Sequence, residues 1–148
     1  YISSPILFHC VEHAAAIQDM HFMLQKEVVD RMAAEPGSKV YGRLSVMLQL
    51  ACKVTPLFTV PPGAFRPPPK VDSAVVRLVP LAPEQLPKGD PAKIHTVVKA
   101  AFAMRRKTLT NTLKGLVDEA TIRELGIDPR ARAETLAPGD FVKLANAM

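Results

Sequence analysis

The sequence has 148 residues, of which 48% are hydrophobic and 22% are charged, and its formal net charge is +5. This composition is ordinary for a small globular chain and excludes disordered and fibrous proteins. No uncharged apolar run approaches the ~18 residues that a membrane-spanning helix needs, and the first residues resemble no signal peptide. Because the sequence also lacks an initiator methionine, we expect a fragment. We also expect the protein to be cytoplasmic.

The positive charge is concentrated in one part of the sequence. Residues 1–80 carry 8 basic and 6 acidic side chains, whereas residues 91–117 carry 6 basic side chains and no acidic one. A solvated helix face is the simplest explanation of such a run. In an otherwise mixed sequence, however, the run is more typical of a surface that binds phosphates of a nucleic acid.

Prolines divide the sequence into two regions. Of the 14 prolines, 10 lie between Pro56 and Pro91. The pattern before this zone alternates between helices and strands, and the pattern after it is purely helical. This composition predicts a boundary within residues 81–90, with an α/β region over residues 1–80 and a small helical region over residues 81–148.

Helices and strands are both predicted in the first region. The expected helices cover residues 4–11, 26–34 and 44–52, and the expected strands cover residues 20–24, 54–60 and 72–81. The continuous apolar run at 20–24 is typical of a strand that is buried on both faces, as in a parallel sheet. The link between the last two strands is too short for a helical crossover, so we expect these strands to pair antiparallel.

The second region shows apolar side chains at helical spacing, which predicts three or four short helices. The clearest stripes are Ile94, Val97, Val98, Ala101 and Phe102, and later Phe141, Leu144, Ala145 and Met148. Between them, Gly126 is expected to end a helix, and Asp128–Pro129 to begin a turn.

A metal motif is present but weak. His9 and His13 fit the pattern His-x-x-Glu-His, which places two imidazoles on one helix face. A third ligand has no obvious source, so a half-exposed helix end is the better interpretation and we expect no metal. We expect Cys10 and Cys52 to be buried thiols of a reducing compartment.

The strongest local feature is the proline-rich segment 60–76. Prolines stiffen a loop and lower the entropy that its folding costs, so this loop can hold Phe65 at a fixed position on the rim of the sheet. Arg66 and Lys70 flank the ring with positive charge. A held aromatic ring with basic neighbours suits a base taken out of a nucleic-acid stack. The alternative, a structural loop whose phenylalanine caps a core, is equally compatible with the composition.

A second feature is the basic run Arg105, Arg106 and Lys107. Three cations at a helix end favour the helix dipole, which is a purely structural explanation. Because Thr108, Thr110 and Asn111 follow them, the run also resembles a group that grips a phosphate backbone.

Several segments together resemble the small-subunit ribosomal RNA adenine N6,N6-dimethyltransferases. The matching segments are residues 1–6, 23–28, 41–45 and 65–75 and the Arg-Arg-Lys-Thr-Leu element at 105–109, in the order of the family. The Arg-Arg-Lys-Thr element favours this family over the macrolide-resistance methyltransferases, which share the Phe-x-Pro-x-Pro-x-Val loop. The resemblance covers essentially the whole sequence.

The resemblance implies a fold and an activity. Residues 1–80 would be the second half of a Rossmann-like, S-adenosylmethionine-dependent methyltransferase domain, and residues 81–148 a small helical RNA-binding domain. The family methylates N6 of two adjacent adenosines near the 3′ end of small-subunit rRNA and acts in small-subunit assembly, on the pre-30S particle.

The resemblance also implies roles for single residues. Tyr1 matches the tyrosine of the family's Asn-Leu-Pro-Tyr motif, and Phe65 matches a second aromatic that stacks on the target adenine. Arg66, Lys70, Arg105, Arg106 and Lys107 would contact RNA. The Asn that follows the motif tyrosine is missing after Tyr1, and no glycine-rich cofactor loop is present. We therefore expect the S-adenosylmethionine site upstream of this sequence and no methylation by the fragment alone.

A different class of function stays open beside the enzyme. The same fold could serve as an assembly or transcription factor that binds RNA or DNA without catalysis. An intact Asn-Leu-Pro motif and a glycine-rich strand-to-helix turn upstream of Tyr1 would favour the enzyme.

Overall fold

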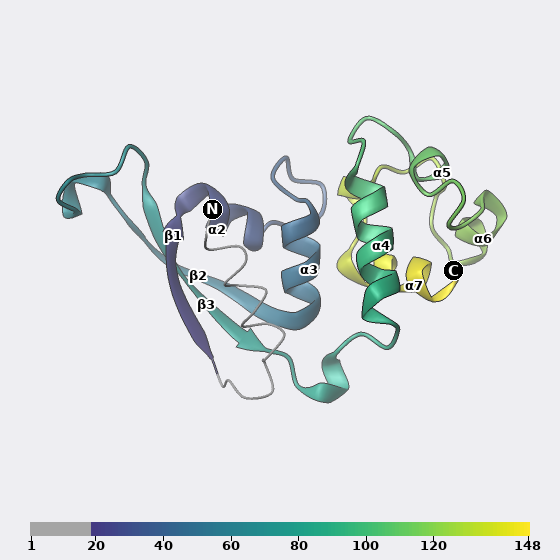
Figure 1. Ribbon diagram of the computed structural model, residues 1–148, viewed down its shortest axis with the longest axis horizontal. Coiled ribbons are helices and arrows are strands. Elements are labelled where there is room, and N and C mark those ends of the chain that lie inside the picture. The colour runs from purple at the N-terminus through teal and green to yellow at the C-terminus, as the bar shows by residue number, and fades with distance from the viewer. Residues whose placement is uncertain (1–18) are drawn as a thin grey trace.

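The structure is a computed structural model and describes residues 19–148. Its first part comprises strand β1 (Met20–Gln25), helices α2 (Lys26–Met32) and α3 (Arg43–Ala51), and strands β2 (Cys52–Val60) and β3 (Ser73–Pro80). Its second part comprises helices α4 (Pro91–Phe102), α5 (Leu109–Thr112), α6 (Glu119–Glu124) and α7 (Pro138–Asn146) (Figure 1). The expected first helix, the histidine motif, Cys10 and Tyr1 lie outside the described residues.

The three strands form one sheet in the order β1-β3-β2, with β3 antiparallel to both neighbours. The predicted antiparallel pairing of the last two strands is therefore confirmed. Alternate residues of β3 point to one buried face, where Ala74, Val76 and Leu78 are at most 5% exposed. Alternating burial of this kind is typical of a strand that is covered by other elements on one face only.

The prediction for residues 20–24 was right in type but wrong in environment. The run forms β1, yet Met23 is 54% exposed and exposure alternates along the strand. The described neighbour of β1 is the antiparallel β3, because the chain places its last strand between the other two. An apolar run of this length does not by itself distinguish burial on one face from burial on two.

Helix α3 separates two apolar cores. One core joins the sheet to α2 and α3 through side chains such as Val29, Met32 and Leu48. The other joins α3 to the helical tail, and includes Val46 of α3. Figure 1 shows α3 standing between the sheet and α4, in agreement with its packing against β2, α4 and α7. A single amphipathic helix thus holds the two parts of the chain together.

The end of α3 passes directly into β2. The expected helix over 44–52 begins and ends one residue earlier, because Cys52 already has an extended backbone. Cys52 is 2% exposed, and this burial raises the pKa of its thiol. The prediction of a buried thiol is confirmed for Cys52.

The helical tail begins at a well-formed cap. The Asp90 carboxylate accepts a hydrogen bond from the backbone N–H of Ala92 at 2.9 Å, and Pro91 occupies the first helical position. Both residue types are preferred at helix starts. The first backbone amides have no acceptor within the helix, so a side chain such as that of Asp90 can accept from one of them, and proline has no amide hydrogen that would need an acceptor. The stripe predicted for this helix is confirmed, with Ile94, Val97, Val98 and Ala101 buried.

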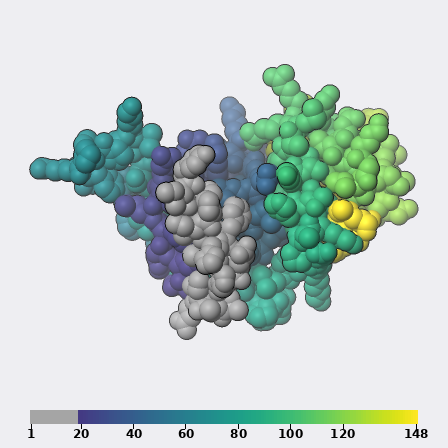
Figure 2. Space-filling model, viewed as in Figure 1, coloured from purple at the N-terminus to yellow at the C-terminus, as the bar shows by residue number. Residues whose placement is uncertain are grey.

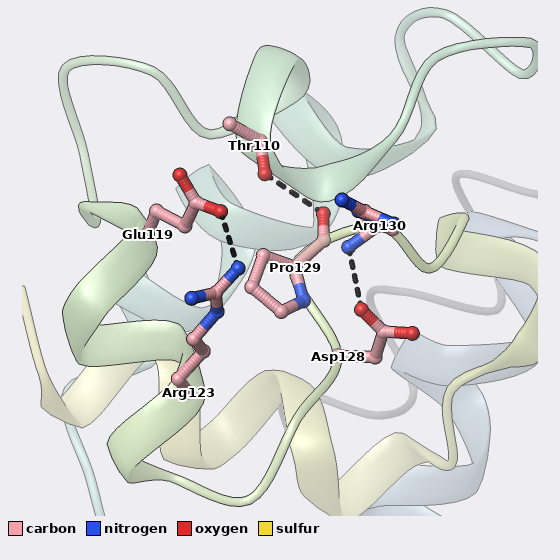
Figure 3. A network of polar contacts seen from close by, with 6 residues as sticks. All are labelled: Thr110, Glu119, Arg123, Asp128, Pro129 and Arg130. Atoms are coloured by element: carbon pink, nitrogen blue, oxygen red, sulfur yellow. Dashed lines mark hydrogen bonds and ion pairs between the residues drawn. The ribbon is translucent and has the colours of Figure 1, made fainter.

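The segment 127–131 ties the short tail helices together (Figure 3). Thr110 donates from both its hydroxyl and its amide to the carbonyl oxygen of Pro129, at 2.9 and 3.1 Å. The predicted turn at Asp128–Pro129 is confirmed, because the Asp128 carboxylate accepts from the amide of Arg130. On α6, Arg123 pairs with Glu119 at 2.8 Å.

The sequence suggested that the basic run 105–107 lies at a helix end, but the structure places it in the loop that follows α4. Helix α4 ends at Phe102, and the three cations occupy the loop before α5. After this loop, the amide of Leu109 donates to the carbonyl oxygen of Ala131, and the Leu109 side chain is buried in the tail core. The run therefore lies just beyond the C-terminal end of α4 and not within its last turn.

Candidate nucleic-acid interface

The loop between β2 and β3 positions Phe65. Pro61 and Pro62 begin a short 3₁₀ turn, Pro62–Ala64, after which the amide of Phe65 donates to the carbonyl oxygen of Pro62 at 3.2 Å. Proline fixes its own φ and removes donors, so few alternative conformations compete with this turn. The backbone of Phe65 is extended, and its side chain is half-buried.

The ring of Phe65 belongs to neither of the two apolar cores formed by residues 19–148. Arg66 and Lys70 are exposed on the same loop. Figure 2 shows the end of the β2–β3 hairpin projecting from the body of the molecule. Within the described part of the chain, the arrangement is therefore a partly exposed ring with cationic neighbours on a projecting loop.

The same hairpin carries a second aromatic that the sequence reasoning missed. Phe58, on β2, is 59% exposed, and its neighbour Leu57 is 44% exposed. The pairing of β2 with β3 shifts between Pro56 and Phe58, which breaks the alternation of faces at this point. Proline in a strand commonly marks such a bulge or an edge, and it is the signal in the sequence that could have located the irregularity.

The second basic group is held differently. Arg105 donates from Nη2 to the carbonyl oxygen atoms of Lys39 and Tyr41, at 2.9 and 3.2 Å. Arg106 and Lys107 are exposed and form no ion pair within residues 19–148. Arg105 therefore has a structural contact, whereas the charges of its two neighbours face solvent.

The structure does not bring the two basic groups together. In Figure 1 the β2–β3 connection lies at the left end of the molecule, and the α4–α5 loop lies above its right half, with α2 and α3 between them. The phenylalanine loop and the basic run 105–107 therefore do not form one continuous surface. A ligand that contacts both groups must be an extended one.

Tyr41 is the residue that fixes the loop under Arg105. Its side chain is fully buried, and its hydroxyl donates to the carbonyl oxygen of Leu136 at 2.7 Å. Its ring meets that of Phe102 edge-on, with the centroids 6.1 Å apart. Burial, and to a smaller extent the charge of Asp140, raises the pKa of Tyr41, so the hydroxyl stays protonated and remains a donor.

The fold of this chain is that of known RNA methyltransferases. It superposes on the crystal structure of a dimethyladenosine transferase from Plasmodium falciparum with a TM-score of 0.85, at 29% identity, over 97% of this chain and 61% of that one. It also superposes on the 23S rRNA methyltransferase ErmE with a TM-score of 0.70, at 24% identity, over 99% and 60% of the two chains. The class is thus the second half of a Rossmann-like methyltransferase fold followed by small helices, as predicted.

The family is defined by the sequence as a whole. The model of the ribosomal RNA adenine dimethylase family matches residues 1–148, and this chain belongs to that family. A protein named ribosomal RNA small subunit methyltransferase A in Xanthomonas euvesicatoria pv. vesicatoria is 64% identical over 145 residues, covering 98% of this chain and 55% of that protein. Its namesake in Xanthomonas campestris pv. campestris (strain B100) is 63% identical, with the same coverage.

The chain spans about half the length of the curated relatives it matches. The described residues contain no glycine-rich turn between a strand and a helix of the kind that cradles a nucleotide-like cofactor. Strand β1 passes directly into α2 at Lys26, and the glycines with positive φ, Gly37, Gly115 and Gly126, lie in the turns outside the sheet. These residues do not fit S-adenosylmethionine as a bound group.

Residues 19–148 contain neither a cluster of metal ligands nor a membrane-spanning helix. Within that range no three His, Cys, Asp or Glu side chains gather as metal ligands do. The helices of the same range are all too short or too polar to cross a bilayer.

Proposed function

We propose that this chain is part of an enzyme that transfers methyl groups from S-adenosylmethionine to N6 of two adjacent adenosines near the 3′ end of small-subunit rRNA. The observation that carries the proposal is the family match over residues 1–148. The names of the Xanthomonas relatives and of the Plasmodium structure support the same reaction class. The proposal extends to a role in assembly of the small subunit on the pre-30S particle in the cytoplasm.

The division of labour follows the two parts of the chain. We assign residues 1–80 to the catalytic domain, as its C-terminal half, and residues 81–148 to RNA binding. The methyl donor is assigned to the part of the relatives that this chain does not span, because the described residues offer it no cradle. The same reasoning predicts that residues 1–148 alone do not methylate.

Phe65 is proposed to stack on the target adenine. An exocyclic adenine amine is a poor nucleophile because its lone pair is delocalised into the ring, so orientation of the base supplies much of the rate. A half-buried ring on a proline-stiffened loop presents a flat apolar surface to the base. Because the loop is already rigid, binding of the base costs little conformational entropy. Tyr1, as the tyrosine of the family's motif, is proposed to stack on the same base, and it lies outside the described residues.

The exposed cations are proposed to hold the sugar-phosphate strand. Arg66 and Lys70 would contact phosphates beside the flipped base, and Arg106 and Lys107 would contact a more distant part of the RNA. Arg105 would act partly by fixing the loop, because one of its amino groups is already bonded to two carbonyl oxygens. The separation of the two groups suits a folded RNA better than a short oligonucleotide.

A chimaeric enzyme tests the proposal. This chain would replace the matched region of the Xanthomonas euvesicatoria relative, and incorporation of radiolabelled methyl groups into unmodified small-subunit particles would be measured. We expect dimethylation of two adjacent adenosines, located by primer extension. Binding of the particles without any methyl transfer, in a chimaera that folds and binds S-adenosylmethionine, would instead favour the non-catalytic RNA- or DNA-binding factor.

A further inference from the structure

A further basic feature adjoins the α4–α5 loop and includes Arg105 of the group already described. An open pocket of about 370 Å³ forms where the loop between α2 and α3 meets the end of α4. Its lining includes four basic side chains and no acidic one. The four are Arg31, Lys39, Arg43 and Arg105.

Most of this positive charge is not neutralised by neighbours. Arg31 pairs with Glu27 at 2.8 Å, but Lys39 and Arg43 are exposed and form no ion pair within the described range. Arg105 contacts carbonyl oxygens, which leave its formal charge in place. A pocket lined by unbalanced cations focuses a positive potential and attracts an anion.

Helix α3 adds to this potential. The helix has nine residues and begins at Arg43, and its first three residues line the pocket. Its N-cap position is Gly42, which has no side chain that could accept from the first amides. Free amides and the positive end of the helix dipole favour a phosphate at such a position.

The walls of the pocket are held before any ligand arrives. The hydroxyl of Ser45 donates to the carbonyl oxygen of Arg31, and Gln49 Nε2 donates to those of Met32 and Ala34 at 3.0 and 2.9 Å. The amide of Gly37 donates to the carbonyl oxygen of Glu134 at 2.7 Å. Because these bonds span α2, α3 and the tail, ligand binding would order little backbone.

We infer that this pocket binds a phosphate group of the RNA backbone, with Lys39 and Arg43 as the residues that contact it. The inference rests on the proposed function, because it makes the ligand a strand of the same RNA. It also extends the RNA contact from the α4–α5 loop, which carries Arg105, to the loop before α3, which carries Lys39. Phosphate contacts of this kind fix the position of a nucleic acid without reading its sequence.

The test compares two double variants that lose the same charge. In the chimaera, Lys39→Ala with Arg43→Ala removes the pocket cations, whereas Arg123→Ala with Lys143→Ala removes two cations that pair with Glu119 and Asp140 elsewhere. Binding to a labelled RNA hairpin from the 3′ end of small-subunit rRNA would be measured between 50 and 300 mM salt, about the range in which such slopes are determined. Thermal unfolding of each variant would show that it folds.

We expect the pocket variant to bind about tenfold more weakly and its log–log salt slope to fall by roughly 0.7–0.9, which corresponds to the loss of one phosphate contact. The control variant should keep the slope of the parent. A third variant, Arg43→Lys, retains a point charge and should keep most of the slope. Equal slopes in the parent and the pocket variant would overturn the inference.

The source of the phosphate is tested with inorganic phosphate as a separate probe. In an NMR titration, we expect about 10 mM inorganic phosphate to leave the signals of Lys39 and Arg43 unsaturated. The RNA hairpin should saturate the same signals. Saturation by phosphate with no response to RNA would overturn the inference. Failure of the parent chimaera to methylate would refute the proposed function, whereas methylation with an unchanged slope in the pocket variant would refute the pocket alone.

Discussion

The hydroxyl of Tyr41 and the carbonyl oxygen of Leu136, 95 positions apart in the sequence, are joined by a hydrogen bond of 2.7 Å in the interior of the molecule. Tyr41 precedes α3, and Leu136 precedes α7, so this bond links the loop under the basic pocket to the last tail helix. Arg105 also contacts this loop, through the carbonyl oxygen of Tyr41. The position of the cations therefore depends on a buried neutral hydrogen bond.

Replacement of Tyr41 by phenylalanine should destabilise the chain by about 1–3 kcal/mol, because it leaves a buried carbonyl oxygen without its donor. Urea denaturation monitored by circular dichroism measures the change. Thr96→Val is a matched control, since it removes an exposed hydroxyl that donates to the carbonyl oxygen of Ala92 and should shift the free energy of unfolding by less than about 0.5 kcal/mol. Equal effects of the two changes would contradict the role of Tyr41.

Stability should also depend on alkaline pH through Tyr41. Burial raises the pKa of its hydroxyl above the ordinary value of 10.0, so the folded state favours the protonated form. The corresponding stabilisation is complete below the ordinary value and is lost as the pH rises toward the raised one. We therefore expect the free energy of unfolding to fall more steeply in the parent than in Tyr41→Phe as the pH rises above the ordinary value of 10.0. Parallel curves would show that Tyr41 does not carry this dependence.

Asp90 should matter for the start of the helical tail. Asp90→Ala removes the acceptor of the Ala92 amide at the N-terminus of α4 and should lower the free energy of unfolding by about 1 kcal/mol. Asp90→Asn keeps an acceptor and should cost less than half of that. Chemical denaturation distinguishes the two, and an alanine variant as stable as the parent would show that the cap contributes nothing.

The two exposed cation pairs should contribute separately to RNA binding. Arg66→Ala with Lys70→Ala, and Arg106→Ala with Lys107→Ala, should each reduce the log–log salt slope by roughly 1.4–1.8 if both residues touch phosphate. Because the two pairs lie in different parts of the molecule, their effects on the binding free energy should add. Filter binding of the rRNA hairpin across a salt series measures both. A pair whose removal leaves the slope unchanged is not in the interface.

The sequence predicted correctly those elements whose side chains follow a strong local pattern. It did not predict features that depend on which elements lie side by side in the fold. The stripe of α4, the antiparallel pairing of β2 with β3 and the turn at Asp128 were all legible from local pattern. The environment of β1 was not, because it depends on which strand lies beside it.

The candidate site was predictable in parts. Phe65 and its cations stand out by composition, since prolines and basic residues enclose one aromatic ring. The basic pocket could not be found in this way, because Lys39 and Arg43 meet Arg105 only through the fold. The hydrogen bond from the amide of Leu109 to the carbonyl oxygen of Ala131 likewise joins residues that are far apart in the sequence.

The most direct test of the account replaces Phe65 by alanine and by tyrosine in the chimaera. Methyl transfer to unmodified small-subunit particles and affinity for the RNA hairpin would be measured together. Phe65→Ala should lower kcat/KM by about a hundredfold or more through misplacement of the adenine, with affinity changed by less than about fivefold because the phosphate contacts remain. Phe65→Tyr, which keeps the ring, should stay near the parent. Undiminished methylation by the alanine variant would contradict the claim that this ring holds the target base.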